Sequence, residues 1–182
     1  MIKRLRKLAN KLLSTLLLHG DKQEVERAMR LRKKISGGGH LRWLCATLYQ
    51  HLCERNNCYF PLQAQVPEDT VFPHGLSGIH FSMGAVVGHG CTILHHVTIG
   101  SNTLTDSPGF GAPVIGDNVF IGTGAAIIGG VRVGNNVRIG ANAVVVRDVP
   151  DNATVVAAPS RIILHDEPRD NCFVSYTEST SK

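Results

Sequence analysis

A six-residue repeat of aliphatic positions runs through the C-terminal half of the chain. A small or β-branched residue follows four positions after each aliphatic one, and glycine often stands directly after it. The aliphatic positions are Ile115, Ile121, Ile127, Val133, Ile139 and Val145, and the small positions are Val119, Ala125, Val131, Val137, Ala143 and Val149. The same repeat starts earlier at Phe81, Val87, Ile93 and Ile99, with Ala85, Cys91, Val97 and Thr103 in the second position.

A spacing of six does not hold one face of an α-helix, where successive residues turn by about 100°. An even spacing does hold one face of a strand. Glycine permits the positive φ of a tight turn, so each repeat predicts a short strand and a turn. Repeats of this kind stack as coils that bury their apolar edges against each other. An ordinary β-sandwich of short strands is the alternative, but its strands keep no fixed spacing.

The first part of the chain is predicted to be helical, over residues 2–19, 21–34 and 40–54. Gly20 suits a C-terminal cap, Asp21 with Glu24 resembles a capping box, and residues 36–39 form a glycine-rich linker. The apolar face predicted for the third helix consists of Leu41, Leu44, Cys45, Leu48 and Leu52. Imperfect strands are expected from Phe60 and Val66 onward.

The repeat is interrupted at residues 101–114, which predicts that about ten residues loop out of the solenoid on a functional face. Residues 164–182 are polar and aperiodic, and they are expected to form a tail. We therefore divide the chain into a helical region (1–57), a β-helix (58–163) and a tail (164–182).

Charge is concentrated at the N-terminus, where residues 1–34 hold eleven Lys or Arg against three acids. No nucleic-acid motif or interleaved aromatic residue accompanies them, so a nucleic-acid partner is not expected. Two explanations stay open: peripheral membrane contact, or packing on other helices or another subunit. Both would use the predicted stripe of Ile2, Leu5, Leu8, Leu12 and Leu16.

No convincing signal peptide or membrane span is present, and the five cysteines have neither metal-ligand spacing nor an even number. These features predict reduced thiols and a cytoplasmic protein.

Three segments carry a resemblance to a known family: "TILHHVTIGSN", "APVIGDNVFIGTGAAIIGGVRVGNNVRIGANAVVVRDVP" and "NATVVAAPSRII". Residues 58–163 resemble the left-handed β-helix (hexapeptide-repeat) acyltransferases, and residues 92–162 are more specifically similar to serine O-acetyltransferases. The resemblance implies left-handed coils, trimers with acetyl-CoA in grooves between neighbouring β-helices, and helices that join larger oligomers such as dimers of trimers. The helical region is shorter here than in the full-length enzymes.

Acetyl transfer from a thioester to a hydroxyl needs a base for the hydroxyl proton, and histidine suits this role near neutral pH. His74, in "FPHGLSGIH", lies in a segment comparable to the H-x-x-G segment of the catalytic histidine in the similar enzymes, where the distance to "VTIG" is one residue shorter. His95 and His96, in "ILHHVT", are the next candidates. The alternative for each is an ordinary surface histidine. A zinc site is not expected, because no acidic or thiol ligands are grouped with these histidines.

The chain departs from the serine enzymes at several positions. Cys58 aligns with an aspartate beside the base, Pro73 with a second aspartate, and Gly111 and Ala112 with an Arg-His pair. Glu68, Asp69 or Asp106 is expected to orient the histidine in place of the missing aspartates.

Coenzyme-binding positions follow from the same resemblance. Backbone amides at Gly122, Gly124, Ala125 and Ala141 resemble the ledge that meets the pantetheine arm. Arg147 and Arg161 occupy basic positions where similar proteins approach the phosphates, and arginine suits phosphate by geometry. The glycines and alanines have a structural alternative, since coils also need small residues where they turn.

These features predict an acetyl-CoA-dependent O-acetyltransferase whose acceptor is a small hydroxyl compound, L-serine in the pathway to cysteine. The alternatives are a sugar or capsular polysaccharide hydroxyl as acceptor, a β-helix used as a non-catalytic scaffold or binding module, and a metal-dependent enzyme of carbonic-anhydrase type.

Overall fold

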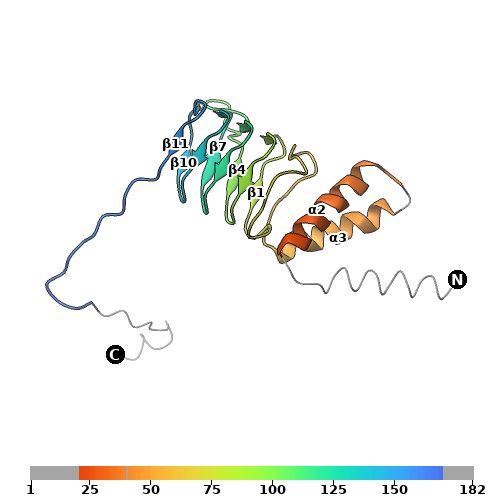
Figure 1. The fold of residues 1–182 in the computed structure, drawn as a ribbon, viewed down its shortest axis with the longest axis horizontal. Helices are drawn as coiled ribbons and strands as arrows, with labels where there is room; N and C mark the ends of the chain where they lie inside the picture. Colours follow the sequence, from red (N-terminus) through yellow and green to blue (C-terminus); the bar gives the residue numbers. More distant parts are fainter. Residues whose placement is uncertain (1–20, 40, 170–182) are drawn as a thin grey trace.

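A computed structural model of the protein describes residues 21–39 and 41–169. Helices α2 (Asp21–Ser36) and α3 (Arg42–Arg55) form a hairpin at one end of a β-prism (Figure 1). Their bounds agree with the second and third predicted helices to within about two residues. The helix predicted over residues 2–19 lies outside the described residues.

The described part of the prism contains eleven short strands in three parallel sheets: sheet A (β1-β4-β7-β10), sheet B (β2-β5-β8) and sheet C (β11-β9-β6-β3). Their bounds are β1 His80–Phe81, β2 Val86–Val87, β3 Thr92–Ile93, β4 Thr98–Gly100, β5 Val114–Ile115, β6 Phe120–Ile121, β7 Ala126–Ile128, β8 Arg132–Val133, β9 Arg138–Ile139, β10 Val144–Val145 and β11 Thr154–Val155. Single bridges at Tyr59, Gln65 and Val71 begin the three sheets before β1. The prediction of a parallel β-helix after N-terminal helices is confirmed.

The aliphatic residue of each repeat is the buried member of its strand. All ten predicted positions from Phe81 to Val145 are at most 4% exposed, and the residue before each points outward. The second positions are buried at the corners, with one exception. Thr103 is exposed, because the chain leaves the prism just after β4 instead of turning its corner.

At the corner between sheets B and C, the structure shows why glycine follows the aliphatic residue of the repeat. There the side-chain oxygens of Asp117, Asn135 and Asp151 accept backbone N–H groups of His89, Asp117 and Asn135 at 2.7–2.8 Å, one coil after another. A Cβ at Gly116 would lie 2.6 Å from Asn135 Oδ1. Glycine is therefore required where this polar ladder approaches the backbone.

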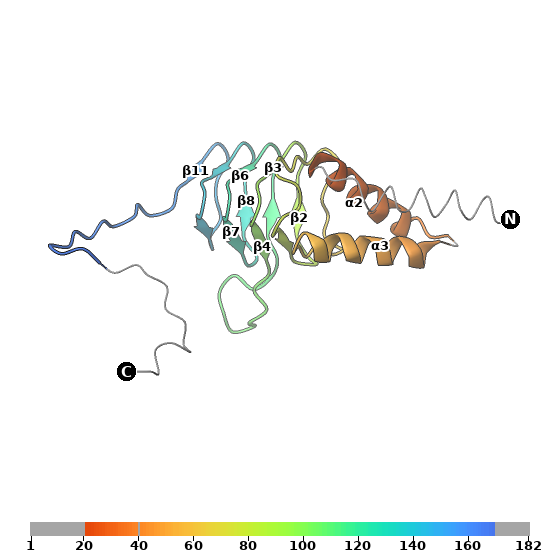
Figure 2. The same ribbon diagram turned by 90° about the horizontal axis from the view of Figure 1, so that it is seen from below.

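The predicted loop leaves the prism between sheets A and B. Asn102 and Gly111 pair as an antiparallel bridge that closes its neck, and Leu104 and Phe110 are exposed on it. Figure 2 shows the loop projecting away from the coils. The insertion leaves the coil register intact, since Thr98 still pairs with Ala126 across it.

Arg32 of α2 joins the hairpin to the first coil. Its guanidinium donates hydrogen bonds to the carbonyl oxygens of Pro61 and Ala64 at 2.7 Å each and to that of Phe60 at 3.2 Å. It also lies 4.0 Å from the centroid of the Phe60 ring. Tyr49 of α3 donates its hydroxyl to the same Phe60 carbonyl.

The apolar face predicted for α3 is partly wrong. Leu41 is 54% exposed at the end of the hairpin far from the prism, whereas Tyr49 is the buried residue of α3. Leu41 was placed on the apolar face because it is hydrophobic and has helical spacing. Burial depends instead on which turns of α3 reach the first coil.

The chain leaves the prism after β11, and residues 156–169 are extended and almost entirely exposed (Figure 1). The division at residues 57 and 163 stays a prediction. In the described part of the chain, no helix is long and apolar enough to cross a membrane.

Replacing Arg32 by Met should lower the free energy of unfolding by about 3 kcal/mol, because several carbonyl groups lose a charged donor. Urea denaturation measures this change. Lys33→Met is the matched control: its ion pair with Glu68 is exposed, and such pairs contribute roughly 0–1 kcal/mol. Equal losses in the two variants would contradict the role given to Arg32.

Candidate active site

The turns that lead from sheet C to sheet A stack into one edge of the prism, which we call the histidine edge (residues 72–79, 94–97, 122–125 and 140–143). Backbone hydrogen bonds join successive turns: His96 N–H donates to Ser77 O, Gly124 N–H to His95 O, and Asn142 N–H to Thr123 O, at 2.9–3.2 Å. Residues far apart in the sequence therefore lie in one column.

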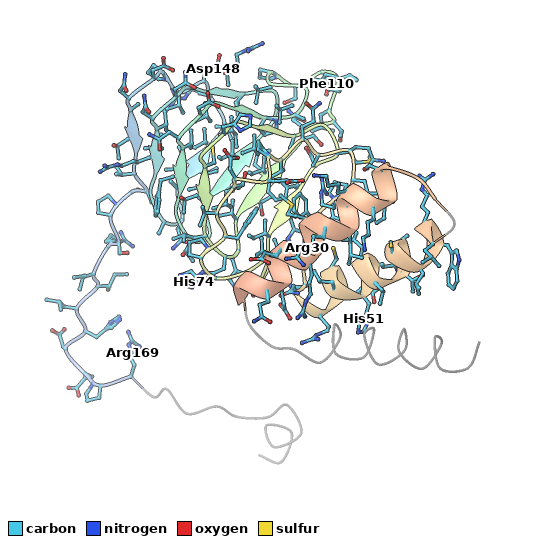
Figure 3. All side chains as sticks on the ribbon, turned by 45° about the vertical axis from the view of Figure 1, so that its right-hand side comes forward. Arg30, His51, His74, Phe110, Asp148 and Arg169 are labelled. Atoms are coloured by element: carbon cyan, nitrogen blue, oxygen red, sulfur yellow. The ribbon has the colours of Figure 1, made fainter. Side chains whose placement is uncertain are left out.

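The three predicted catalytic histidines lie together on this edge. The ring centroids of His74 and His95 are 5.0 Å apart with the planes at 88°, and those of His95 and His96 are 5.2 Å apart at 68°. His74 and His96 are exposed, whereas His95 is half-buried. Figure 3 shows His74 on the opposite side of the prism from the loop residue Phe110.

Gly78 provides the space for His96. A Cβ at Gly78 would lie 2.2 Å from His96 Nδ1, and both residues have positive φ, +63° and 58°. The sequence contained the signal for this contact, because Gly78 precedes His96 by one coil. The histidine motif alone does not indicate this contact, because the contact depends on the coil register.

The four predicted ledge residues occupy the same edge as the histidines. A Cβ at Gly122 would lie 2.6 Å from Ala141 N, and one at Gly124 would lie 2.3 Å from Asn142 Oδ1. Close stacking of the coils therefore requires both glycines. Of the described residues, none accepts the N–H of Ala141 or of Thr123.

The two predicted phosphate-binding arginines lie apart. Arg147 follows β10 at the corner between sheets A and B, which is the corner of the projecting loop. Arg161 lies in the exposed segment after β11, a strand of sheet C, so this segment starts at the end of the histidine edge.

The carboxylates expected to orient His74 are engaged elsewhere. Asp69 Oδ2 lies 3.1 Å from His89 Nδ1 and accepts the N–H of Gly90, and Glu68 pairs with Lys33 at 3.0 Å. Desolvation opposes ionisation of Asp69, yet these hydrogen bonds hold its pKa below the usual value. Asp106 lies on the projecting loop, at a different corner from His74.

Cys58 cannot supply the missing charge. A hydrogen bond with the Cys53 thiol and, after it, burial raise the pKa of Cys58, so its thiol stays neutral. In the described residues, no three His, Cys, Asp or Glu side chains are grouped to hold a metal ion.

Comparisons with known proteins agree with the fold. The profile of the family described as bacterial transferase hexapeptide (six repeats) matches residues 112–147. Serine acetyltransferase from Neisseria gonorrhoeae, solved in complex with serine, is 30% identical with a TM-score of 0.62, covering 78% of this chain and 56% of its own. Serine acetyltransferase 1 from Entamoeba histolytica, in complex with L-cysteine, is 29% identical with a TM-score of 0.60, covering 75% and 52%.

The chain contains hexapeptide repeats and is similar to serine acetyltransferases. A serine acetyltransferase solved in complex with CoA is 25% identical over 82% of this chain and 60% of its own, with a TM-score of 0.62. A probable serine acetyltransferase from Oryza sativa subsp. japonica is 45% identical over 56 residues, which are 31% of this chain and 18% of that protein. These similarities confirm the predicted left-handed β-helix with N-terminal helices. The chain spans about half the length of the solved serine acetyltransferases.

Replacing Gly78 by Ala in this serine acetyltransferase-like protein should displace the His96 ring and cost roughly 1–2 kcal/mol, since alanine also disfavours positive φ. NMR spectra of the histidine rings measure the displacement. Gly109→Ala is the control, because its φ is also positive, +79°, but its Cβ would meet nothing within 4 Å. An unmoved His96 ring in Gly78→Ala would refute the packing described here.

Proposed function

We propose that this protein is an acetyl-CoA-dependent O-acetyltransferase, with L-serine as the acceptor. The observation that carries the proposal is the histidine edge, where three clustered histidines share one column with small turn residues. Two N–H groups of these turns have no acceptor among the described residues. The similar structures solved with serine and with CoA support the same pair of substrates.

His74 is the general base in this proposal. Its exposed imidazole takes the proton of the acceptor hydroxyl as the oxygen attacks the thioester carbonyl, and returns a proton to the departing sulfur. Acetyl-CoA supplies the acetyl group, and no residue of the chain needs to carry it. His95 and His96 stay candidates for further roles in the same site.

Backbone N–H groups of the turns have two different roles in this proposal. The N–H groups of Gly124 and Asn142 are used in stacking the coils, so they are not available to the negative charge that develops on the carbonyl oxygen. The unpaired N–H groups of Thr123 and Ala141 are available, and Ala141 is one of the predicted ledge residues. Arg161 follows at the end of this edge and is proposed to reach the phosphates, with Arg147 contributing only from a second copy.

The resemblance to the acyltransferases implies a homotrimer, and the character of sheet A supports an interface on that face. Its outward side chains include no Asp, Glu, Lys or Arg, whereas sheets B and C present Arg132 and Arg138. The outward residues of sheet A are His80, Thr98, Ala126, Ile128 and Val144. Because the histidine edge borders this uncharged face, a second prism packed there would form a cleft beside His74. Assembly of trimers through the helices stays a prediction.

L-serine is favoured over a sugar acceptor by the similarity to serine acetyltransferases, although Cys58 and Pro73 replace the aspartates of those enzymes. Cys45, Cys53, Cys58 and Cys91 are free thiols among the described residues, and this supports a reducing, cytoplasmic location.

The variant His74→Ala should retain its fold and assembly but lose at least ~10²-fold in kcat, because general base catalysis contributes this much. Release of CoA thiol from acetyl-CoA, with serine and a panel of sugars as acceptors, measures the loss and identifies the acceptor. Unimpaired turnover would remove His74 from the role of base.

Binding provides the control for this variant. Both wild type and His74→Ala should be stabilised against heat by acetyl-CoA, since the ledge does not depend on His74. A wild-type protein that acetyl-CoA does not stabilise would instead be a scaffold or binding module.

A further inference from the structure

Among the described residues, the ring of His74 makes an aromatic contact with the ring of His95. Its own ring nitrogens make no hydrogen bond within that part of the chain. The centroid separation of 5.0 Å and the perpendicular planes are those of a favourable edge-to-face pair. The orientation of the proposed base is therefore set by a neighbouring ring.

We propose that His95 is the positioning residue of this site, and that its ring holds the His74 imidazole in the orientation that proton transfer requires. The inference rests on the acetyltransferase function proposed above. It assigns to a histidine the orienting work that a carboxylate performs beside many catalytic histidines.

His95 is well placed for this work because its own position is fixed. Its backbone carbonyl accepts the N–H of Gly124 from the next coil, in the turn between β3 and β4. Its ring is half-buried, whereas the His74 ring is exposed. The half-buried His95 ring can therefore restrict how the exposed His74 ring turns.

The contact acts through the shape of the ring. Nδ1 of His95 is buried with no hydrogen-bond partner in the described part of the chain, so it neither donates to His74 nor accepts from it. A buried nitrogen without a partner is unfavourable compared with a carbon at the same place. A phenyl ring should therefore preserve the contact, and a side chain without a ring should not.

The groups expected beside His74 do not replace this contact in the described part of the chain. Asp69 and Glu68 interact with His89 and Lys33, and the neutral Cys58 thiol is hydrogen-bonded to the Cys53 thiol. Without His95, the exposed His74 ring would turn about its side-chain bonds, because the terminal torsion of histidine has a broad energy profile. Misplacement of a reacting group by about 1 Å can cost roughly 10²-fold in rate.

Three substitutions at one position separate shape from chemistry. His95→Ala removes the ring, His95→Phe keeps a ring without nitrogen, and His95→Gln keeps polar atoms without a ring. We expect His95→Ala and His95→Gln to lose about 10- to 100-fold in kcat with the KM for acetyl-CoA nearly unchanged, and His95→Phe to retain most of kcat. His89→Asn, at the corner between sheets B and C, is the control and should have wild-type activity.

The NMR shift of the His74 ring protons gives a readout that needs no activity. The adjacent ring should shift these protons in the wild type and in His95→Phe, and the shift should disappear in His95→Ala and His95→Gln. Melting temperatures identify any variant that fails to fold. The comparison is then made between the folded variant that keeps a ring or the wild type and the folded variant without a ring.

Two results would overturn the inference: wild-type kcat in His95→Ala, or an active His95→Gln beside an impaired His95→Phe, which would make the nitrogen the essential feature. If the wild type transfers no acetyl group, the proposed function fails. The ring-proton shifts then decide alone whether His95 positions His74.

Discussion

Parallel backbone hydrogen bonding between successive coils is the constraint on which the rest of the structure depends. His80 pairs with Thr98, and Ala126 pairs with Val144, so these two coils advance the chain by the same number of residues. The parallel pairing is also kept where a coil is longer, as between Thr98 and Ala126. Every position of one coil therefore lies over the equivalent position of the next. This register creates the aliphatic core, the polar ladder at one corner and the histidine edge at another.

The same register explains why function can be carried by so few special residues. The carbonyl oxygen of His95 accepts the N–H of Gly124 from the next turn. The carbonyl oxygen of Thr123 accepts the N–H of Asn142 from the turn after that. Placing the proposed base and the proposed ligand-binding ledge in one column requires only that suitable residues occupy turns of one type. The loop at residues 102–111 can project from a different corner because it preserves the pairing of Thr98 with Ala126.

Much of the fold could be predicted from the sequence, because a strict repeat reports directly which side chains are buried. The strands from β1 to β10 and the projecting loop were predicted in this way. The errors arose where burial depends on contacts between parts with different periods. Leu41 was expected to be buried and is exposed, and no pattern in α2 indicated that Arg32 would bind the carbonyl groups of the first coil.

The candidate site shows a similar division. The motifs selected His74, His95 and His96, and the coil register brings them together, but the motifs could not reveal which ring contacts which. The sequence also could not show which carboxylates lie near His74. Asp69 instead lies at the corner of His89, because only a few residues separate two corners of a prism.

A crystal structure of the protein with bound CoA tests the account most directly. We predict the pantetheine arm along residues 122–125 and 140–143, with its sulfur facing His74, in a cleft completed by the uncharged face of a second copy. CoA bound at another corner, such as that of Arg147, or an isolated prism with no room for a thioester beside His74, would contradict it.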